Sequence, residues 1–155
     1  MIDYILKANK RIIFVLFISV WITSCKQLEI PKSSPIITQQ ATPCYGSCPV
    51  YTLSIYDNRT VTLRAENFLP LQGNHIARMN QKQFDALIDL INSKIFDFKN
   101  QYTADISDQP TVYLSFNHQG RTKQIEDYYG APQELKALEA EIFKLIYSLK
   151  WKKAR

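Results

Sequence analysis

Residues 42–51 read Thr-Pro-Cys-Tyr-Gly-Ser-Cys-Pro-Val-Tyr, and they predict a closed turn that leads directly into a β-strand. Three residues separate Cys44 from Cys48, and a proline lies just outside each end of this pair. Both prolines fix φ near about −65° and disfavour helix for the residue before them, while Gly46 can adopt a positive φ easily. The turn therefore brings two sulfur atoms together at the entrance of a strand.

The residues after this turn alternate with period two, which is typical of strands with one buried face. Residues 50–56 and 60–65 alternate on either side of a turn at residues 57–59, so they predict a β-hairpin. Residues 75–79 can supply a short third strand, because Pro70 and Gly73 interrupt the chain before it. The side chains expected to face inward in the hairpin are Tyr51, Leu53, Ile55, Val61, Leu63 and Ala65.

A first helix is predicted from residue 80 onward. Asn80, with Gln83 three residues later, matches a capping box in which each side chain satisfies a free backbone N–H. Residues 100–110 are polar and predict a loop. The apolar stripe of the helix consists of Phe84, Leu87, Ile88, Ile91 and Ile95.

A second hairpin and a second helix follow. Residues 111–116 and 121–127 alternate around a turn in which Gly120 is expected to take a positive φ. Pro132 is favoured at the first position of the helix. Basic residues at 150–155 suit the negative end of the helix dipole, or could contact anionic lipid. The expected apolar stripe consists of Leu135, Leu138, Ile142, Leu145, Ile146 and Leu149.

These elements predict an α+β fold in the order ββ-β-α-ββ-α. An antiparallel sheet of two hairpins and a short strand, with both helices on one face, buries all the apolar stripes. We expect a single domain over residues 42–155, preceded by a signal peptide at residues 1–24 and a tether at residues 25–41. Part of the tether could pair as an edge strand.

The start of the chain predicts export. Three basic residues precede an apolar run at residues 12–22, which is shorter than the roughly 20 residues of a membrane span and suits a signal-peptide core. Residues 22–25, Ile-Thr-Ser-Cys, resemble the lipobox of bacterial lipoproteins. That resemblance implies cleavage before Cys25, acylation of Cys25, and a lipid anchor in the cell-envelope membrane. Lys26 stands where an aspartate marks inner-membrane retention in some bacteria, which favours the outer membrane and leaves its face open.

Charge and cysteine content agree with an exported protein. The whole chain has 19 Lys and Arg against 14 Asp and Glu, and removal of residues 1–24 reduces the net charge to about +3. So small an excess in an exported protein does not suggest a nucleic-acid partner. The two cysteines that remain beside Cys25 are closely spaced, as expected in an oxidising compartment.

Three motifs resemble the bacterial family of domains of unknown function numbered 6438. They are residues 42–51, residues 108–111 (Asp-Gln-Pro-Thr) and residues 127–132 (Asp-Tyr-Tyr-Gly-Ala-Pro), and the resemblance covers about residues 40–150. It implies an exported or lipid-anchored protein and brings no established activity. Residues 57–59 depart from the family, which usually has a glycine in this hairpin turn.

Three interpretations of Cys44 and Cys48 stay open. The sequence favours a structural disulfide. A copper site is the second, because Cys-x-x-x-Cys-Pro resembles the site of the Sco-type assembly proteins, with His75 or His118 as a distant ligand. A strand, rather than the helix of that fold, follows Pro49 here. A redox dithiol is the third, although no activating cation or helix N-terminus is evident in the sequence.

No catalytic motif with a recognisable spacing occurs in the chain. Asp105, Asp108, Glu126 and Asp127 could bind a hard cation, but their spacing fits no calcium loop, so solvated loop acids are favoured. Tyr128 and Tyr129 either cover the sheet edge or form a recognition surface. The possible binding surface consists of Tyr45, Asp108, Asp127, Tyr128 and Tyr129.

The sequence therefore predicts an envelope lipoprotein with a non-enzymatic binding or structural domain and no cofactor. Its expected partners are the membrane and an unidentified envelope ligand or protein. The alternative is a thiol-redox or copper-handling protein that uses the cysteine pair.

Overall fold

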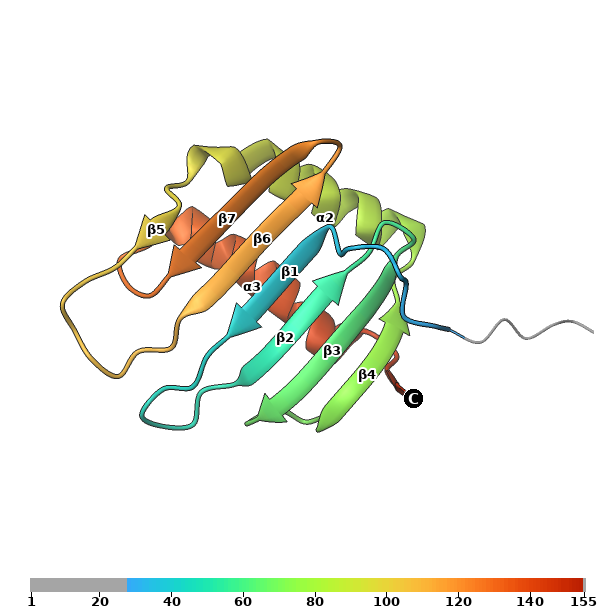
Figure 1. Ribbon diagram of the computed structural model, residues 1–155, viewed down its shortest axis with the longest axis horizontal. Coiled ribbons are helices and arrows are strands. Elements are labelled where there is room, and N and C mark those ends of the chain that lie inside the picture. Colours follow the sequence, from blue (N-terminus) through green and yellow to red (C-terminus); the bar gives the residue numbers. More distant parts are fainter. Residues whose placement is uncertain (1–27, 155) are drawn as a thin grey trace, which may run out of the picture.

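A computed structural model describes residues 28–154, so the expected signal peptide and Cys25 lie outside the described residues. The described chain folds into an eight-stranded sheet with two α-helices, and both helices lie behind the same face of the sheet (Figure 1). The strands are β1 (Ile37–Ala41), β2 (Val50–Ile55), β3 (Thr60–Asn67), β4 (Gly73–Arg78), β5 (Gln101–Tyr102), β6 (Val112–His118), β7 (Arg121–Asp127) and β8 (Lys152–Lys153). The helices are α2 (Gln81–Lys94) and α3 (Gln133–Ser148), and a 3-10 turn, η2 (Ile95–Asp97), follows α2.

The strand order is β5-β7-β6-β1-β2-β3-β4-β8. Every neighbouring pair is antiparallel except β5 and β7, which run parallel, so the sheet is mixed rather than purely antiparallel as predicted. The α+β class and both hairpins, β2–β3 and β6–β7, are confirmed.

The largest error of the sequence prediction concerns β1. Residues 37–41 were expected in the tether or at a sheet edge, but they form a strand between β2 and β6 in the middle of the sheet. Ile36 extends this pairing, because its backbone N–H bonds to Ile55 O at 2.8 Å and its carbonyl accepts from Asn117 N at 2.7 Å. Strand β1 therefore joins the two hairpins into one sheet.

The turns use positive φ at positions that the sequence predicted only in part. Gly120 has φ 75° as expected, and Gln119 before it also has a positive φ, 51°, which is the pattern of a type I′ hairpin turn. In the first hairpin Arg59 takes φ 67° in the absence of a glycine, and Asn58 Oδ1 accepts a hydrogen bond from Thr60 N at 3.0 Å. Gly46, by contrast, is not among the residues with positive φ, so the disulfide loop does not use the conformational freedom of this glycine.

The start of α2 follows the predicted cap closely. Asn80 Oδ1 accepts a hydrogen bond from Gln83 N at 2.9 Å, which satisfies a free backbone donor. The reciprocal contact differs, because Gln83 Oε1 accepts from the side-chain amide of Asn80 rather than from its backbone. Helix α3 begins one residue later than expected, with Pro132 as its N-cap.

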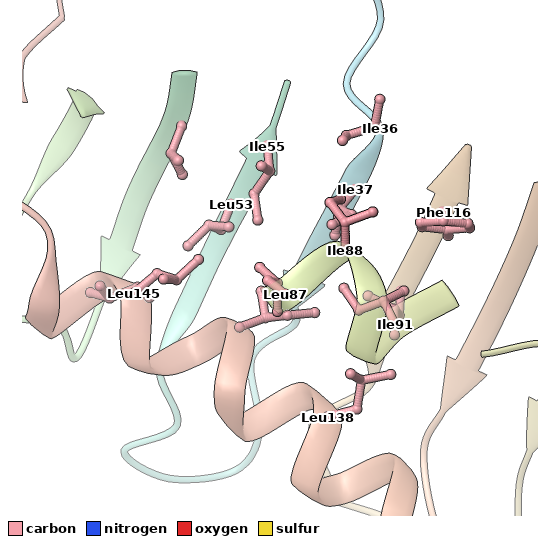
Figure 2. Packing of buried hydrophobic residues seen from close by; sticks show 14 of the residues in the cluster. Ile36, Ile37, Leu53, Ile55, Leu87, Ile88, Ile91, Phe116, Leu138 and Leu145 are labelled. Carbon is pink, nitrogen blue, oxygen red and sulfur yellow. The ribbon is translucent and has the colours of Figure 1, made fainter. Parts of the chain in front are cut away.

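The core lies between the sheet and the two helices (Figure 2). Leu87, Ile88 and Ile91 of α2 lie near Ile37 and Phe116 of the sheet, while α3 contributes residues such as Leu138 and Leu145 (Figure 2). The expected stripe of α2 is buried throughout, and that of α3 is buried except for Leu149, which is half-buried.

The two edge strands of the sheet, β5 and β8, are short and were not predicted from the sequence. Strand β5 occupies residues 101–102, within the expected loop. Strand β8 contains Lys152 and Lys153, so these residues pair with β4 instead of extending α3. The last turn of α3 contains no basic residue, and the helix-dipole explanation of the basic tail was therefore wrong. Within residues 28–154, no helix is both long and apolar enough to cross a membrane.

Candidate functional site

Three loops meet at one end of the sheet. They follow β1 (residues 42–49, here the disulfide loop), precede β6 (residues 103–111) and follow β7 (residues 128–132), and the register places these three strand ends side by side. All three lie toward the lower left of the molecule in Figure 1. The three family motifs of the sequence therefore come together in space.

Hydrogen bonds tie these loops to one another. Thr42 and Thr111 form two, because Thr42 N donates to Thr111 O at 3.0 Å and Thr111 N donates to Thr42 Oγ1 at 2.9 Å. Tyr128 OH donates to Ile106 O, and Tyr128 N donates to Tyr102 O at 2.9 Å. These hydrogen bonds thus fix the relative positions of the loops.

Cys44 and Cys48 are joined in a disulfide, with their Cα atoms 5.8 Å apart. Neither candidate histidine lies beside it. His118 ends β6, whose opposite end contacts the disulfide loop, and that strand length separates them by roughly 20 Å. His75 lies on β4, two strands away from β2. Among residues 28–154, no group of three or more His, Cys, Asp or Glu side chains is arranged to hold a metal ion.

The predicted surface residues divide into exposed and buried ones. Tyr45 at the tip of the disulfide loop is 91% exposed and Tyr129 is 52% exposed. Asp108 is exposed with φ 70°, and Tyr128 is half-buried because it ties two loops together. Asp127 is wholly buried beneath this end, so the expectation of a solvated or surface-lining acid was wrong for this residue.

Asp127 belongs to a buried polar cluster between the sheet and α3. The Lys136 ammonium pairs with Asp127 Oδ2, and it lies 3.6 Å from Glu139 Oε2. Next to this group, Gln39 Nε2 donates to the Tyr51 hydroxyl oxygen at 2.6 Å and to the backbone carbonyl of Glu139 at 3.1 Å. The cluster therefore connects β1, β2 and β7 to one helix.

The electrostatics of this cluster follow from burial. The pKa of Glu139 is raised to about 8, chiefly by burial and then by the neighbouring Asp127 carboxylate, while Lys136 offsets part of the rise. Burial also raises the pKa of Tyr51 to about 12. Asp127 Oδ1 and Glu139 Oε1 have no hydrogen-bond donor within the described part of the chain. Glu139 consequently holds a proton at pH values where an exposed glutamate is ionised.

Two buried carboxyl groups beside an ammonium could exchange a proton, but a substrate would have to reach them. Asp127 and Glu139 are both buried, and only Lys136 of the three extends to solvent. The arrangement suits an internal clamp that holds α3 to the sheet beneath the three loops.

The spacing of residues along the sequence indicates that three members of this cluster face the core. Asp127 is two residues after the buried Ile125, and Gln39 is two residues after Ile37, so both occupy inward positions of their strands. Glu139 is four residues after Leu135, within the apolar stripe of α3.

The family model of the domain of unknown function DUF6438 matches residues 35–146. The chain belongs to this family. The matched DUF6438 region begins just before β1, which agrees with the central position of that strand in the sheet. No significant similarity is found to curated proteins or to solved structures.

Proposed function

We propose that this protein is a lipid-anchored domain of the bacterial cell envelope that binds a ligand or a partner protein without catalysing a reaction. Its binding surface is the loop surface formed by Tyr45, Asp108, Tyr128 and Tyr129. The anchor is Cys25, acylated after removal of the signal peptide, and the outer membrane is the expected location.

The observation that carries the binding role is the exposure of aromatic side chains on cross-tied loops. Tyr45 projects from a loop that the disulfide closes, and Tyr129 projects from a loop that is bonded to Tyr102. Tyrosine supplies a large contact area at a small cost in side-chain entropy, and aromatic residues are enriched in protein interfaces. Loops already fixed in the free protein lose little further entropy on binding.

The position of the chain termini supports the membrane anchor. Ile30 and Ala154 line the same hollow beside β3 and β4. The chain therefore enters the domain next to the basic C-terminal residues. Ile30 is the fifth residue after Cys25, and a fully extended chain of that length spans at most about 18 Å. Lys152 and Lys153 are exposed at this edge, where an anionic lipid surface would attract them.

The anchor is tested by metabolic labelling with a fatty-acid analogue. Wild type should incorporate label, and Cys25→Ala should not. If the wild-type protein incorporates no label, the proposal that Cys25 carries a lipid anchor is wrong.

The loop surface is tested separately by site-specific photo-crosslinking in intact cells. A photoreactive phenylalanine analogue at position 45 should give one discrete adduct. The matched control is position 147, since Tyr147 is 61% exposed on α3 and belongs to none of the three loops. Adducts of equal yield at both positions, or none at position 45, would refute the loop surface.

A further inference from the structure

The face of the sheet opposite the helices is divided into two halves. Over β2, β3 and β4, Ile30 and Ala154 lie beside outward side chains such as Thr62 and Asn74. Over β1, β6, β7 and β5, the sheet bears a hollow of about 550 Å³. Neither Ile30 nor Ala154 lines this second hollow.

The register of the strands arranges the lining of this hollow in two parallel rows. The first row crosses four strands and consists of Gln40, Tyr113, Glu126 and Gln101. The second row crosses three strands and consists of Thr38, Ser115 and Gln124. Neighbours in a row are about 4.8 Å apart, and both rows point away from the helices because they alternate with core residues.

Differences in side-chain length create the hollow. Thr38 and Ser115 are short and form its floor, together with the backbone at Leu114, whose side chain is buried in the core. Tyr113 is longer and is 42% exposed. Gln101 closes the side at β5, where its Nε2 donates to Glu126 Oε2 at 3.3 Å.

The chemistry of the lining limits what can bind. Amide side chains both donate and accept hydrogen bonds, and so do the hydroxyl groups of Thr38 and Ser115. The lining contains no Lys or Arg, and its only ionisable acid is Glu126. An anionic ligand would therefore find no cation, and an apolar ligand would leave the amides without partners.

We propose that this hollow binds a neutral saccharide. The ring of Tyr113 packs against the apolar face of one sugar ring, and the amide and hydroxyl side chains of the two rows hydrogen-bond to the sugar hydroxyl groups. A volume of about 550 Å³ falls within the range of small-ligand sites, roughly 300–1,000 Å³. The inference does not depend on the lipid anchor or on the loop surface, because it uses different residues on a different face.

The test measures binding of maltotriose, cellotriose and chitotriose to the full chain by isothermal titration calorimetry. The protein is purified in a detergent without a sugar headgroup. At least one trisaccharide should bind with a Kd of millimolar or tighter. Tyr113→Ala should raise this Kd at least tenfold, while Tyr113→Phe should preserve it, because stacking needs only the ring.

Two controls make the result decisive. Tyr147→Ala removes a tyrosine that is even more exposed, on the helix side of the molecule, and should leave the Kd unchanged. Gln124→Glu should weaken binding, because it replaces an amide donor with a carboxylate. The proposal is overturned if none of the three sugars binds at millimolar concentration, or if Tyr113→Ala binds as well as wild type. Equal binding of a uronic-acid trisaccharide would also overturn the assignment to neutral sugars.

Discussion

Lys136, near the start of α3, forms an ion pair with Asp127, the last residue of β7, whose carboxylate is wholly buried. Only five residues lie between the strand and the helix, so this pair fixes the connection that carries Tyr128 and Tyr129. The exposed loop surface thus rests directly on a buried charge pair.

Loss of this ammonium should destabilise the fold. Lys136→Met keeps the length of the side chain and leaves Asp127 as an unpaired buried charge, a change that typically costs about 3–5 kcal/mol. Lys136 is 43% exposed, so we expect a smaller loss in the free energy of unfolding, about 2–3 kcal/mol. Denaturant unfolding monitored by circular dichroism measures it.

Lys144→Met is the matched control for this change. Lys144 pairs with Glu141 within α3, but both side chains are largely exposed, so the loss should stay below about 1 kcal/mol. Equal losses for the two variants would contradict the role of Asp127 burial.

Glu139 should make the stability of the protein depend on pH. Its pKa rises from 4.5 to about 8 on folding, so between these values the folded protein holds a proton that the unfolded chain has released. The free energy of unfolding should therefore decrease as pH rises from about 5 to about 8. The groups facing this carboxyl are Asp127, Lys136 and Tyr51, and all three stay unchanged in the two variants described next, Glu139→Gln and Glu141→Gln.

Glu139→Gln should remove most of this decrease, because the amide does not ionise. Glu141→Gln, on the exposed side of the same helix, should retain it. Unfolding curves recorded at several pH values within this interval measure both slopes. A Glu139→Gln variant with the wild-type slope would show that another group is responsible.

Two glycines should respond differently to alanine. Gly130 has φ 81°, in the left-handed region, so Gly130→Ala should cost about 1–2 kcal/mol. At Gly46 the backbone is outside that region, and an added Cβ would lie 3.8 Å from Cys44 Sγ, an ordinary contact. Gly46→Ala should therefore change stability by less than about 0.5 kcal/mol. Thermal unfolding of both variants checks the order, and a larger effect at Gly46 would contradict the geometry.

The parts of the fold that the sequence predicted are those decided by local pattern. Alternation located β2, β3, β6 and β7, and the stripe from Phe84 to Ile91 located α2. Strand β1 was missed because its central inward residue is Gln39, whose buried amide bonds to Tyr51 and α3. Its strand conformation comes from pairing with β2 and β6, which are distant in sequence, and no local pattern reports such pairing.

The candidate site was predicted in its outer parts only. Residues 42–51 indicated a closed cysteine loop, and the disulfide is present. Asp127 was predicted to be solvated because its spacing from the neighbouring acids fits no calcium loop. Its partner Lys136 belongs to the next helix. The pair therefore depends on how α3 packs across the sheet, which no local sequence pattern predicts.

Thiol content, stability and cuprous-ion binding distinguish a structural cysteine pair from a reactive one. If the disulfide is structural, the protein isolated from cells should contain no free thiol at Cys44 or Cys48. Closure of a five-residue loop stabilises the fold by about 2 kcal/mol in the chain-entropy model, so Cys44→Ala/Cys48→Ala should lose roughly this amount. Thiol titration in denaturant and unfolding curves of the double variant measure the two quantities.

A copper or redox role predicts easy reduction by glutathione. It also predicts that the reduced protein binds one cuprous ion and that the double variant loses this binding. His118→Ala is the control for that role, because His118 lies at the far end of β6 and its removal should leave any cuprous binding unchanged. Stoichiometric binding of cuprous ion that requires both cysteines would overturn the structural assignment.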